Sequence, residues 1–285
     1  PVQVEEGSFH VGEPRRTPLV ARGAIANVSG TARYRRPFAS GPNSSPGFPD
    51  SPWPSPVDAP RRENGMNVCW SLKGGSGTTV VAAGLALAVA RRGGRPLLID
   101  LAGDLPAVLG VEGAGPGITD WCSAADGPGP EALERLGVDV PGGTRLVALG
   151  TSGWHQAEAE RVAALADHLV QCDDPLVVDA GDLGTSRAPD ALLDALVGRA
   201  ARSIFVTRAC YLSLRRLPAQ VRRPTEVALV VEPGRALGRL DVEAVVGSPV
   251  TMRIPLDPSI ARAVDAGLLA RRVPRSLLRG VREGA

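Results

Sequence analysis

From residue 66 onward the sequence alternates short apolar runs with runs long enough to form helices. The apolar runs are rich in Val, Leu and Ile without polar alternation, which is typical of strands covered on both faces in a parallel sheet. The amphipathic runs between them indicate the covering helices. We therefore predict an α/β fold with an open, doubly wound, mostly parallel sheet of seven strands. These strands are expected at 66–71, 96–100, 144–149, 175–179, 203–207, 226–231 and 250–254.

Helix-length runs follow most of these strands. Helices are expected at 79–91, 156–170, 189–197, 212–221, 241–246 and 258–266. Residues 113–143 are rich in glycine and carry only short patterns, so we expect a partly helical excursion at the edge of the sheet. In 269–282, arginines surround Leu277, Leu278 and Val281, and we expect a terminal helix packed on the sheet. A helix lying on a membrane surface is the alternative, although Pro274 divides the segment.

The first 65 residues differ from the rest in composition. Eleven of the 26 prolines lie there, where they would repeatedly interrupt any helix or central strand. We predict a Pro-rich disordered arm or linker over 1–65 and one α/β domain over 66–285. The arm also carries arginines near Tyr34 and Phe38, so it is a candidate for docking a protein partner.

Charge, cysteine spacing and hydropathy exclude several classes of protein. The chain has 32 basic and 30 acidic side chains, a net charge of +2, which argues against an obligatory nucleic-acid binder. The four cysteines are far apart and form no CxxC pair, so neither a zinc site nor a disulfide framework is indicated. The longest apolar stretch, 80–90, is much shorter than the roughly 20 residues that cross a bilayer. We expect a cytoplasmic protein.

The most informative motif follows the first expected strand. That strand, MNVCWS, leads into KGGSGTT at 73–79, after which a helix rich in Ala, Leu and Val begins. Glycines let the backbone wrap its N–H groups around an anion, and the helix N-terminus adds a positive dipole. Lys73 is the only lysine among the 32 basic residues, which indicates that an ammonium is needed there. The motif predicts a phosphate-binding loop, and a strand-to-helix turn without a ligand is the alternative.

KGGSGTT resembles the deviant Walker A loop, KGGxGK[ST]T, of the MinD/ParA family of P-loop ATPases. Three more segments agree: PLLID at 96–100 with the family's second strand, PLVVD at 175–179 with its Walker B strand, and IPLDP at 254–258 with the segment lining its adenine pocket. DLAGDLPAVLG at 100–110 is most similar to the CpaE-like branch, associated with pilus assembly and polar positioning. The resemblance covers 66–275 and implies bound ATP and Mg²⁺ in a homodimer.

The resemblance also implies a role for each matching residue. Thr79 would ligate Mg²⁺, and Asp100 and Asp179 would hold the water shell of the metal or the attacking water. Lys73 would reach across the dimer to the phosphates of the partner, and it forms the implied catalytic pair with Asp100. The implied nucleotide-binding residues are Lys73, Gly74, Gly75, Ser76, Gly77, Thr78, Thr79, Pro255 and Asp257.

Four departures from the family pattern surround this one ligand. Thr78 stands where the ordinary P-loop lysine would be, so we expect weaker nucleotide binding. Ala102 stands at the position of the water-activating aspartate, two residues before Asp104, so we expect slow hydrolysis or none. Ala-Gly-Asp follows Asp179 in place of Thr-Pro-Pro, and Glu232 replaces the asparagine that recognises adenine. The loop is therefore a degenerate version of the motif.

Three functional hypotheses remain open from the sequence. The first is a dimerising, ATP-binding spatial organiser with weak or no hydrolysis. The second is a pseudo-ATPase scaffold that acts through partner binding, which Thr78 and Ala102 favour. The third is a metabolic relative of the same fold, such as an enzyme like dethiobiotin synthetase. Contacts with a membrane surface through the C-terminal arginines, or with DNA through the arginine pairs at 215–216 and 222–223, are more weakly supported.

Overall fold

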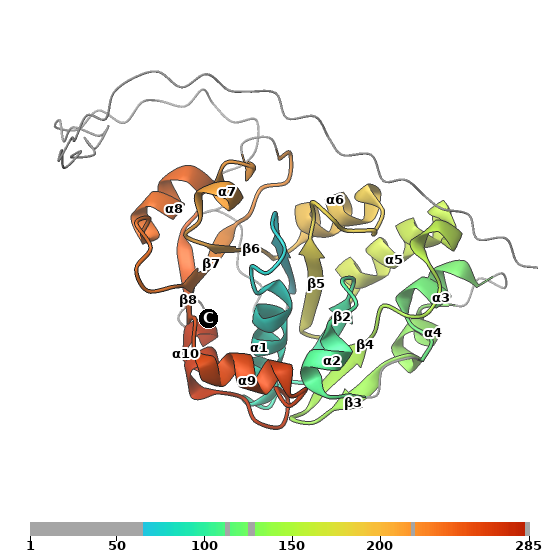
Figure 1. Cartoon of the computed structure of the whole chain (residues 1–285). Helices are drawn as coiled ribbons and strands as arrows, with labels where there is room; N and C mark the ends of the chain where they lie inside the picture. The colour runs from blue at the N-terminus through green and yellow to red at the C-terminus, as the bar shows by residue number, and fades with distance from the viewer. Residues whose placement is uncertain (1–64, 112–114, 125–128, 218–219, 283–285) are drawn as a thin grey trace, which may run out of the picture. The chain divides into compact units, whose positions relative to one another are not determined.

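The computed structural model of the protein describes residues 65–111, 115–124, 129–217 and 220–282. Within them, an eight-stranded sheet carries helices on both faces (Figure 1). The strands are β1 (Met66–Ser71), β2 (Leu97–Asp100), β3 (Val138–Val140), β4 (Thr144–Val147), β5 (Leu176–Asp182), β6 (Arg202–Arg208), β7 (Glu226–Val231) and β8 (Val250–Pro255). Their order is β3-β4-β2-β5-β1-β6-β7-β8, and all neighbours are parallel except β3 and β4. The arm predicted for 1–65 lies outside the described residues, apart from Gly65.

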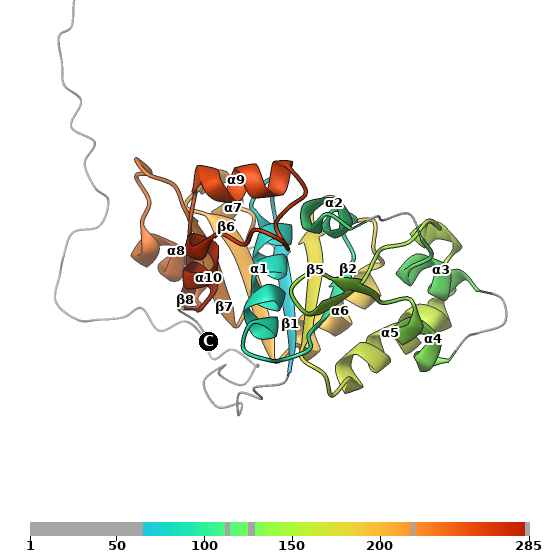
Figure 2. The ribbon, with the colours of Figure 1, turned by 90° about the horizontal axis from the view of Figure 1, so that it is seen from below.

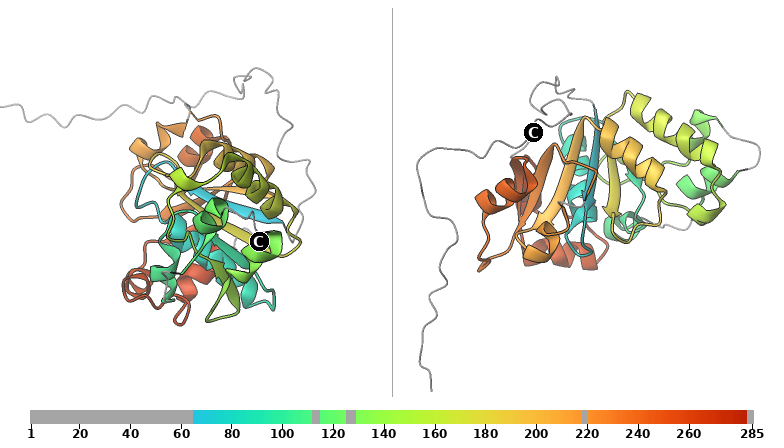
Figure 3. Two further views of the ribbon diagram at one scale, coloured as in Figure 1. Left: turned by 90° about the vertical axis from the view of Figure 1, so that its right-hand side faces the viewer. Right: turned by 90° about the horizontal axis from the view of Figure 1, so that it is seen from above.

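Two layers of helices cover the sheet. The helices are α1 (Thr78–Ala90), α2 (Leu105–Leu109), α3 (Ile118–Ser123), α4 (Pro130–Arg135), α5 (Ala159–Gln171), α6 (Asp190–Arg199), α7 (Tyr211–Leu214), α8 (Arg239–Val246), α9 (Pro258–Asp265) and α10 (Arg275–Arg282), with a 3₁₀ turn, η1 (Trp154–Gln156). One layer consists of α1, α2, α9 and α10, and α3 to α8 form the other. Figure 2 shows α9 and α2 on the opposite side of the sheet from α5 and α6, and the right-hand view of Figure 3 shows α5 and α6 side by side.

The apolar strand runs account for this arrangement. In β1, Val68 and Trp70 pack into the core under α5 and α6, whereas Cys69 between them packs into the core under α1. Successive side chains of a strand point to opposite faces, so a strand covered by helices on both faces is mostly apolar along its length. None of the helices in the described ranges has the length and apolarity that crossing a bilayer requires.

The doubly wound, mostly parallel sheet is confirmed, with one strand more than predicted. The additional strand, β3, is short and pairs antiparallel with β4 at the edge of the sheet. It lies in the glycine-rich excursion, whose described parts also form α3 and α4. Three residues with two exposed side chains carry too little pattern to predict a strand. The helix predicted at 212–221 is wrong in extent, because α7 ends at Leu214, four residues before Pro218.

The packed terminal helix is confirmed. Leu277, Leu278 and Val281 of α10 are buried against α1 and β8. At Gly280 the helix lies so close to the sheet that an added Cβ would meet the carbonyl oxygen of Arg253 at 2.6 Å. Since its apolar face is buried in the protein, α10 presents arginines, not leucines, at its exposed face.

Candidate functional site

A cavity of about 550 Å³ opens at the carboxyl ends of β1, β2 and β5. It is lined by 74–80 after β1, by Leu101, Ala102 and Asp104 after β2, and by 180–182 at the end of β5. In an open parallel sheet, ligands bind outside the carboxyl ends of the strands where the chain order reverses. Here β1 has β5 on one side and β6 on the other, so the cavity lies at such a position.

The glycine loop has the conformation that its residues predict. Gly75 and Gly77 have φ of 73° and 94°, values that side-chain-bearing residues rarely adopt. The hydroxyl of Ser76 donates to the carbonyl oxygen of Lys73 at 2.6 Å and braces the turn from within. Thr78 then begins α1, so the positive end of the helix dipole faces the cavity. The predicted Gly74, Gly75, Ser76, Gly77, Thr78 and Thr79 all line this one cavity.

Lys73 is placed differently from the rest of the loop. Its side chain is exposed and does not line the cavity of its own chain. A cation does lie beneath the loop: Nη1 of Arg216 donates to the carbonyl oxygen of Leu72 at 2.7 Å. Arg208, at the end of β6, is not among the lining residues either, and its buried Nε has no hydrogen-bond partner in the described structure. The lining therefore contains one cation, Arg187, and two acids, Asp104 and Asp182.

Asp179 and Asp100 lie behind the cavity wall. They are register partners on β5 and β2, and both are fully buried. Burial, reinforced by the charge of Asp100, raises the pKa of Asp179 to about 7, and the nearby Thr79 side chain partly opposes this rise. Burial likewise raises the pKa of Asp100 to about 6. Among described atoms, Oδ2 of Asp179 is buried without a hydrogen-bond partner.

The Asp100 carboxylate is occupied by the backbone that follows it. Its oxygens accept hydrogen bonds from the N–H groups of Ala102 at 3.0 Å, Gly103 at 2.6 Å and Leu105 at 3.1 Å. Asp100 therefore folds the β2–α2 loop that lines the cavity, in addition to its implied role toward a metal. This local role was not predicted, although a strand-terminal aspartate followed by Gly and Pro is typical of such turns.

The segment after β5 brings an unpredicted acid to the loop. Oδ2 of Asp182 lies 3.7 Å from the place where a Gly74 side chain would begin, and Asp182 lines the cavity. Gly181 before it has φ of 66°, and a Cβ there would come within 2.9 Å of the Ala102 methyl group. The two departures, at 102 and at 180–182, are thus in contact with each other.

The predicted adenine-pocket residues are not brought into this cavity. Pro255 and Asp257 are absent from its lining. The Asp257 carboxylate instead caps α9 by accepting from the Ser259 N–H at 2.7 Å, and it accepts from the Ser276 hydroxyl at 2.6 Å. Glu232, at the position of the adenine-reading asparagine, is paired with Arg235 at 2.6 Å.

The cavity extends instead toward residues that the sequence interpretation missed. Thr119, Ser152 and Trp154 line it from the segments around α3 and after β4. Asp120 holds this wall by accepting from the hydroxyl groups of Thr151 and Ser152. No motif marks these residues. Only the topology could have predicted them, because 148–154 follow the carboxyl end of β4, which lies next to β2, and ligands bind at the carboxyl ends of such strands.

The residues present fit a Mg²⁺ ion. Magnesium binds through one or two oxygen ligands of the protein, keeps several waters, and completes its shell with substrate phosphates. Thr79 supplies a hydroxyl at the cavity, and a metal-bound water would satisfy the unpartnered Oδ2 of the adjacent Asp179. Asp182 provides a further oxygen at the wall. Within the described residues no cluster of three His, Cys, Asp or Glu forms a metal cage, and this chemistry does not need one.

No protein-family model matches the sequence, and neither does any curated protein. Solved structures match over most of the chain. A ParA family ATPase from Chlorobium tepidum TLS has a TM-score of 0.62 at 21% identity, covering 76% of this chain and 96% of its own. The fold is that of the MinD/ParA ATPases.

Two MinD structures give the same result. The septum site-determining protein MinD of Pyrococcus horikoshii OT3, complexed with Mg-ADP, has a TM-score of 0.59 at 18% identity, covering 76% of this chain and 93% of its own. A chain of the MinC:MinD cell division complex of Aquifex aeolicus has a TM-score of 0.57 at 19% identity, covering 77% and 93%. At these identities the likeness establishes the fold, and the function must be argued from the site.

Proposed function

We propose that this protein binds ATP with Mg²⁺ at the glycine loop, forms a homodimer around the nucleotide and acts in the cytoplasm as a spatial organiser. Positioning of a septum, a chromosome or a pilus is the role that the MinD/ParA fold and the CpaE-like segment at 100–110 support. In this proposal 1–65 is an arm that docks a protein partner, and 66–285 is the nucleotide-binding domain.

One observation carries the proposal. The Thr79 side chain lines the cavity next to the Asp179 carboxylate, which keeps a buried oxygen without a described partner. A buried acceptor left without a partner costs about 1–3 kcal/mol, so its retention needs a compensating ligand. Bound Mg²⁺ would offset the phosphate charge next to Asp182. The chain itself supplies backbone N–H groups at 74–79 for the phosphates and holds the metal side through Thr79.

The exposed Lys73 supports the dimer. Its ammonium is absent from the lining of its own cavity, although it is the only lysine of the chain. All other basic residues of this chain are arginines, so the lysine at 73 indicates a specific use for its ammonium. Because this ammonium lies outside the cavity of its own chain, we infer that it contacts the phosphates bound by a second copy. The dimer therefore supplies part of the positive charge that Thr78 does not provide.

Slow hydrolysis or none follows from Ala102. The methyl group packs toward Gly181, and the nearest lining acids are Asp104 and Asp182. Neither acid stands two residues after Asp100, where the family has its water-activating aspartate. Nucleotide binding is thus the switch, and turnover is a minor activity in this proposal.

Calorimetric titration of the full chain with ATP and Mg²⁺ tests the proposal. We expect saturable binding that Thr79→Val weakens and that Thr251→Val, a change on β8 outside the cavity lining, leaves nearly unchanged. Absence of ATP and ADP binding at millimolar nucleotide would reject the proposal. Thermal unfolding of both variants without nucleotide controls for folding.

The alternative is a pseudo-ATPase scaffold, which the charge of the cavity favours. Its lining has two acids, Asp104 and Asp182, against one arginine, Arg187, and no lysine, so its side chains add no net positive charge to hold phosphates. In that case the fold supports partner binding with an empty site. A measured ATP turnover that disappears in Lys73→Ala would count against the scaffold.

A further inference from the structure

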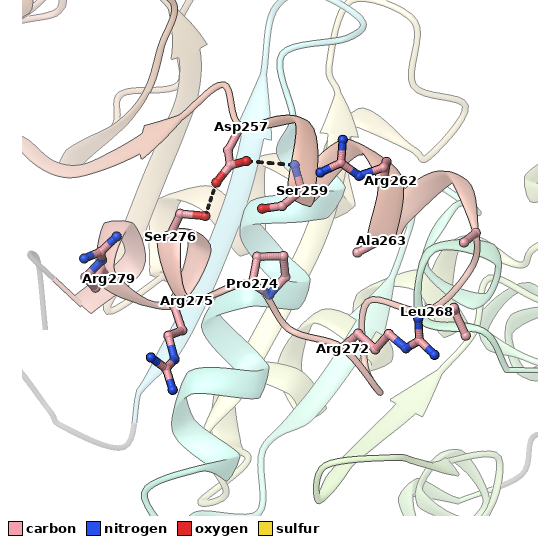
Figure 4. A pocket seen from close by; sticks show the side chains of 11 residues that line it. Asp257, Ser259, Arg262, Ala263, Leu268, Arg272, Pro274, Arg275, Ser276 and Arg279 are labelled. Carbon is pink, nitrogen blue, oxygen red and sulfur yellow. Dashed lines mark hydrogen bonds between the residues drawn. The ribbon is translucent and has the colours of Figure 1, made fainter.

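A second cavity, of about 570 Å³, lies between α9, α10 and the segment that joins them. It shares no lining residue with the cavity at the glycine loop. Four arginines line it: Arg262 from α9, Arg272 from the joining segment, and Arg275 and Arg279 from α10. Figure 4 shows them on different sides of the central Pro274. We refer to this cavity as the arginine pocket.

The arginine pocket carries a net positive charge. All four arginine side chains are exposed, and none forms an ion pair with another described residue. The one acid in the lining, Asp257, already accepts hydrogen bonds from the hydroxyl of Ser276 and the N–H of Ser259. Those hydrogen bonds, first that from Ser276, hold the pKa of Asp257 below its ordinary value, so it stays ionised; its single negative charge is set against four arginines, and the lining remains positive.

The walls of the arginine pocket are anchored. The joining segment returns to α2 through the hydrogen bond from the N–H of Leu269 to the carbonyl oxygen of Val108, at 3.3 Å. On the other side, Leu277 and Val281 fix α10 in the core. Ala263, Leu268 and Pro274 add an apolar surface between the guanidinium groups. A volume near 570 Å³ lies within the range of about 300–1,000 Å³ that small-molecule sites occupy.

The two cavities differ in sign of charge. Two acids and one arginine line the cavity at the glycine loop, whereas four arginines and one acid line the other. The charge of the lining side chains therefore favours an oligophosphate without a metal ion at the second cavity over the first. Guanidinium groups also match phosphate oxygens in bidentate geometry, which a general positive potential does not.

We propose that the arginine pocket binds a small ligand bearing two or three linked phosphate groups, and that it does so without a metal ion. The site is separate from the glycine loop, and the proposal does not depend on ATP binding there. The guanidinium groups of Arg262, Arg272 and Arg275 pair with the phosphate oxygens, and Arg279 adds charge at the rim.

Titration of the full chain with sodium tripolyphosphate in EDTA tests this site. We expect one binding event that Arg262→Gln/Arg275→Gln weakens on the order of tenfold or more, since hydrogen bonds between ionised groups are lost. The matched control is Arg253→Gln/Arg271→Gln, which removes two exposed arginines of the same C-terminal segment outside the pocket. This control variant should change the affinity by less than about threefold, because it removes only a long-range attraction that salt screens. Arg279→Gln provides a second, independent variant.

Four results would overturn the proposal. Equal loss in both double variants would show diffuse charge attraction, and loss in Gly75→Ala, a change in the backbone of the glycine loop, would place the ligand at that loop. Equal affinity for citrate would remove the preference for phosphate. Binding to vesicles containing phosphatidylglycerol without any binding of tripolyphosphate would assign the arginines to a lipid surface. Unchanged unfolding temperatures of the ligand-free variants verify that the fold is intact.

Discussion

Asp100 and Asp179 are register partners at the carboxyl ends of the adjacent parallel strands β2 and β5, and both are fully buried. The charge of Asp100 adds to burial in raising the pKa of Asp179 to about 7. Two carboxyl groups so close together cannot both ionise cheaply in a dry environment. The protonation state of this pair therefore links pH, stability and metal binding.

Stability should depend on pH through this pair. In the unfolded chain both carboxyl groups ionise near pH 4, whereas in the fold they retain protons up to about pH 6 and 7. The native state thus binds more protons between these values, and the free energy of unfolding falls as pH rises through the window. We expect the free energy of unfolding of Asp179→Asn to exceed that of the wild type by at least about 1.4 kcal/mol near pH 8, the value of one pKa unit, and to match it only near pH 4.

Chemical denaturation of both proteins at the two pH values measures this difference. Asp139→Asn is the matched control, because Asp139 has a side chain 91% exposed on the edge strand β3. An equal gain in both variants, or the same gain at both pH values, would contradict the burial of an ionised Asp179.

The loop glycines should be irreplaceable for a backbone reason. Gly77→Ala puts a Cβ on a residue with φ of 94° and 3.5 Å from the side chain of Val230, so we expect a loss of about 1–2 kcal/mol in stability. Nucleotide affinity should fall as well. Gly198→Ala in the exposed part of α6 meets no atom within 4 Å and should stabilise the protein by up to about 1 kcal/mol. Urea denaturation should therefore give a lower free energy of unfolding than the wild type for Gly77→Ala and a higher one for Gly198→Ala.

The close approach of α10 to β8 should tolerate no side chain. Gly280→Ala would place its Cβ 2.6 Å from the carbonyl oxygen of Arg253, and backbone cannot move aside as a flexible side chain can. We expect a loss of about 1–3 kcal/mol from overpacking. Arg282→Ala, an exposed change in the same helix, should stay within about 0.5 kcal/mol of the wild type. Thermal unfolding that ranks the two variants equally would refute the packed position of α10.

Thr78 limits nucleotide affinity in the proposed function. It lines the cavity and is only 6% exposed, so Thr78→Lys should direct a new ammonium along the cavity wall to the phosphates. An added hydrogen bond between ionised groups raises affinity on the order of tenfold. Thr78→Met, of similar length without charge, is the control for packing. Equal ATP affinity in both variants, measured by calorimetry, would show that charge is not what the site lacks.

Much of the fold could be predicted because the buried strands are continuous apolar runs that are easily recognised in the sequence. The apolar runs of β1, β5 and β7 lie between two layers of helices, and such strands need no polar positions. The exposed elements were less visible. β3 buries one of its three residues, so nothing in its sequence distinguishes it from a loop.

The candidate site was predicted only where a local motif encodes it. The residues 74–79 come together because they are neighbours in the sequence and their glycines adopt the turn. Asp182 and Trp154 reach the same cavity through the topology of the sheet, which carries no sequence signature. Conversely, Asp257 belongs to a matching segment but is engaged as the cap of α9. The residues that the resemblance implies at 74–79 thus share one cavity, whereas Pro255 and Asp257 lie outside its lining and their role toward a nucleotide stays a prediction.

The most direct test of the account is the molar mass of the full chain by light scattering, with and without ATP and Mg²⁺. The account predicts that the mass doubles when nucleotide is added and that Lys73→Ala abolishes the doubling while nucleotide binding persists. Arg95→Ala, which removes an exposed cation before β2 at the opposite edge of the sheet, should leave it unchanged. A wild-type protein that binds nucleotide and stays monomeric, or a Lys73→Ala protein that still dimerises, would contradict the account.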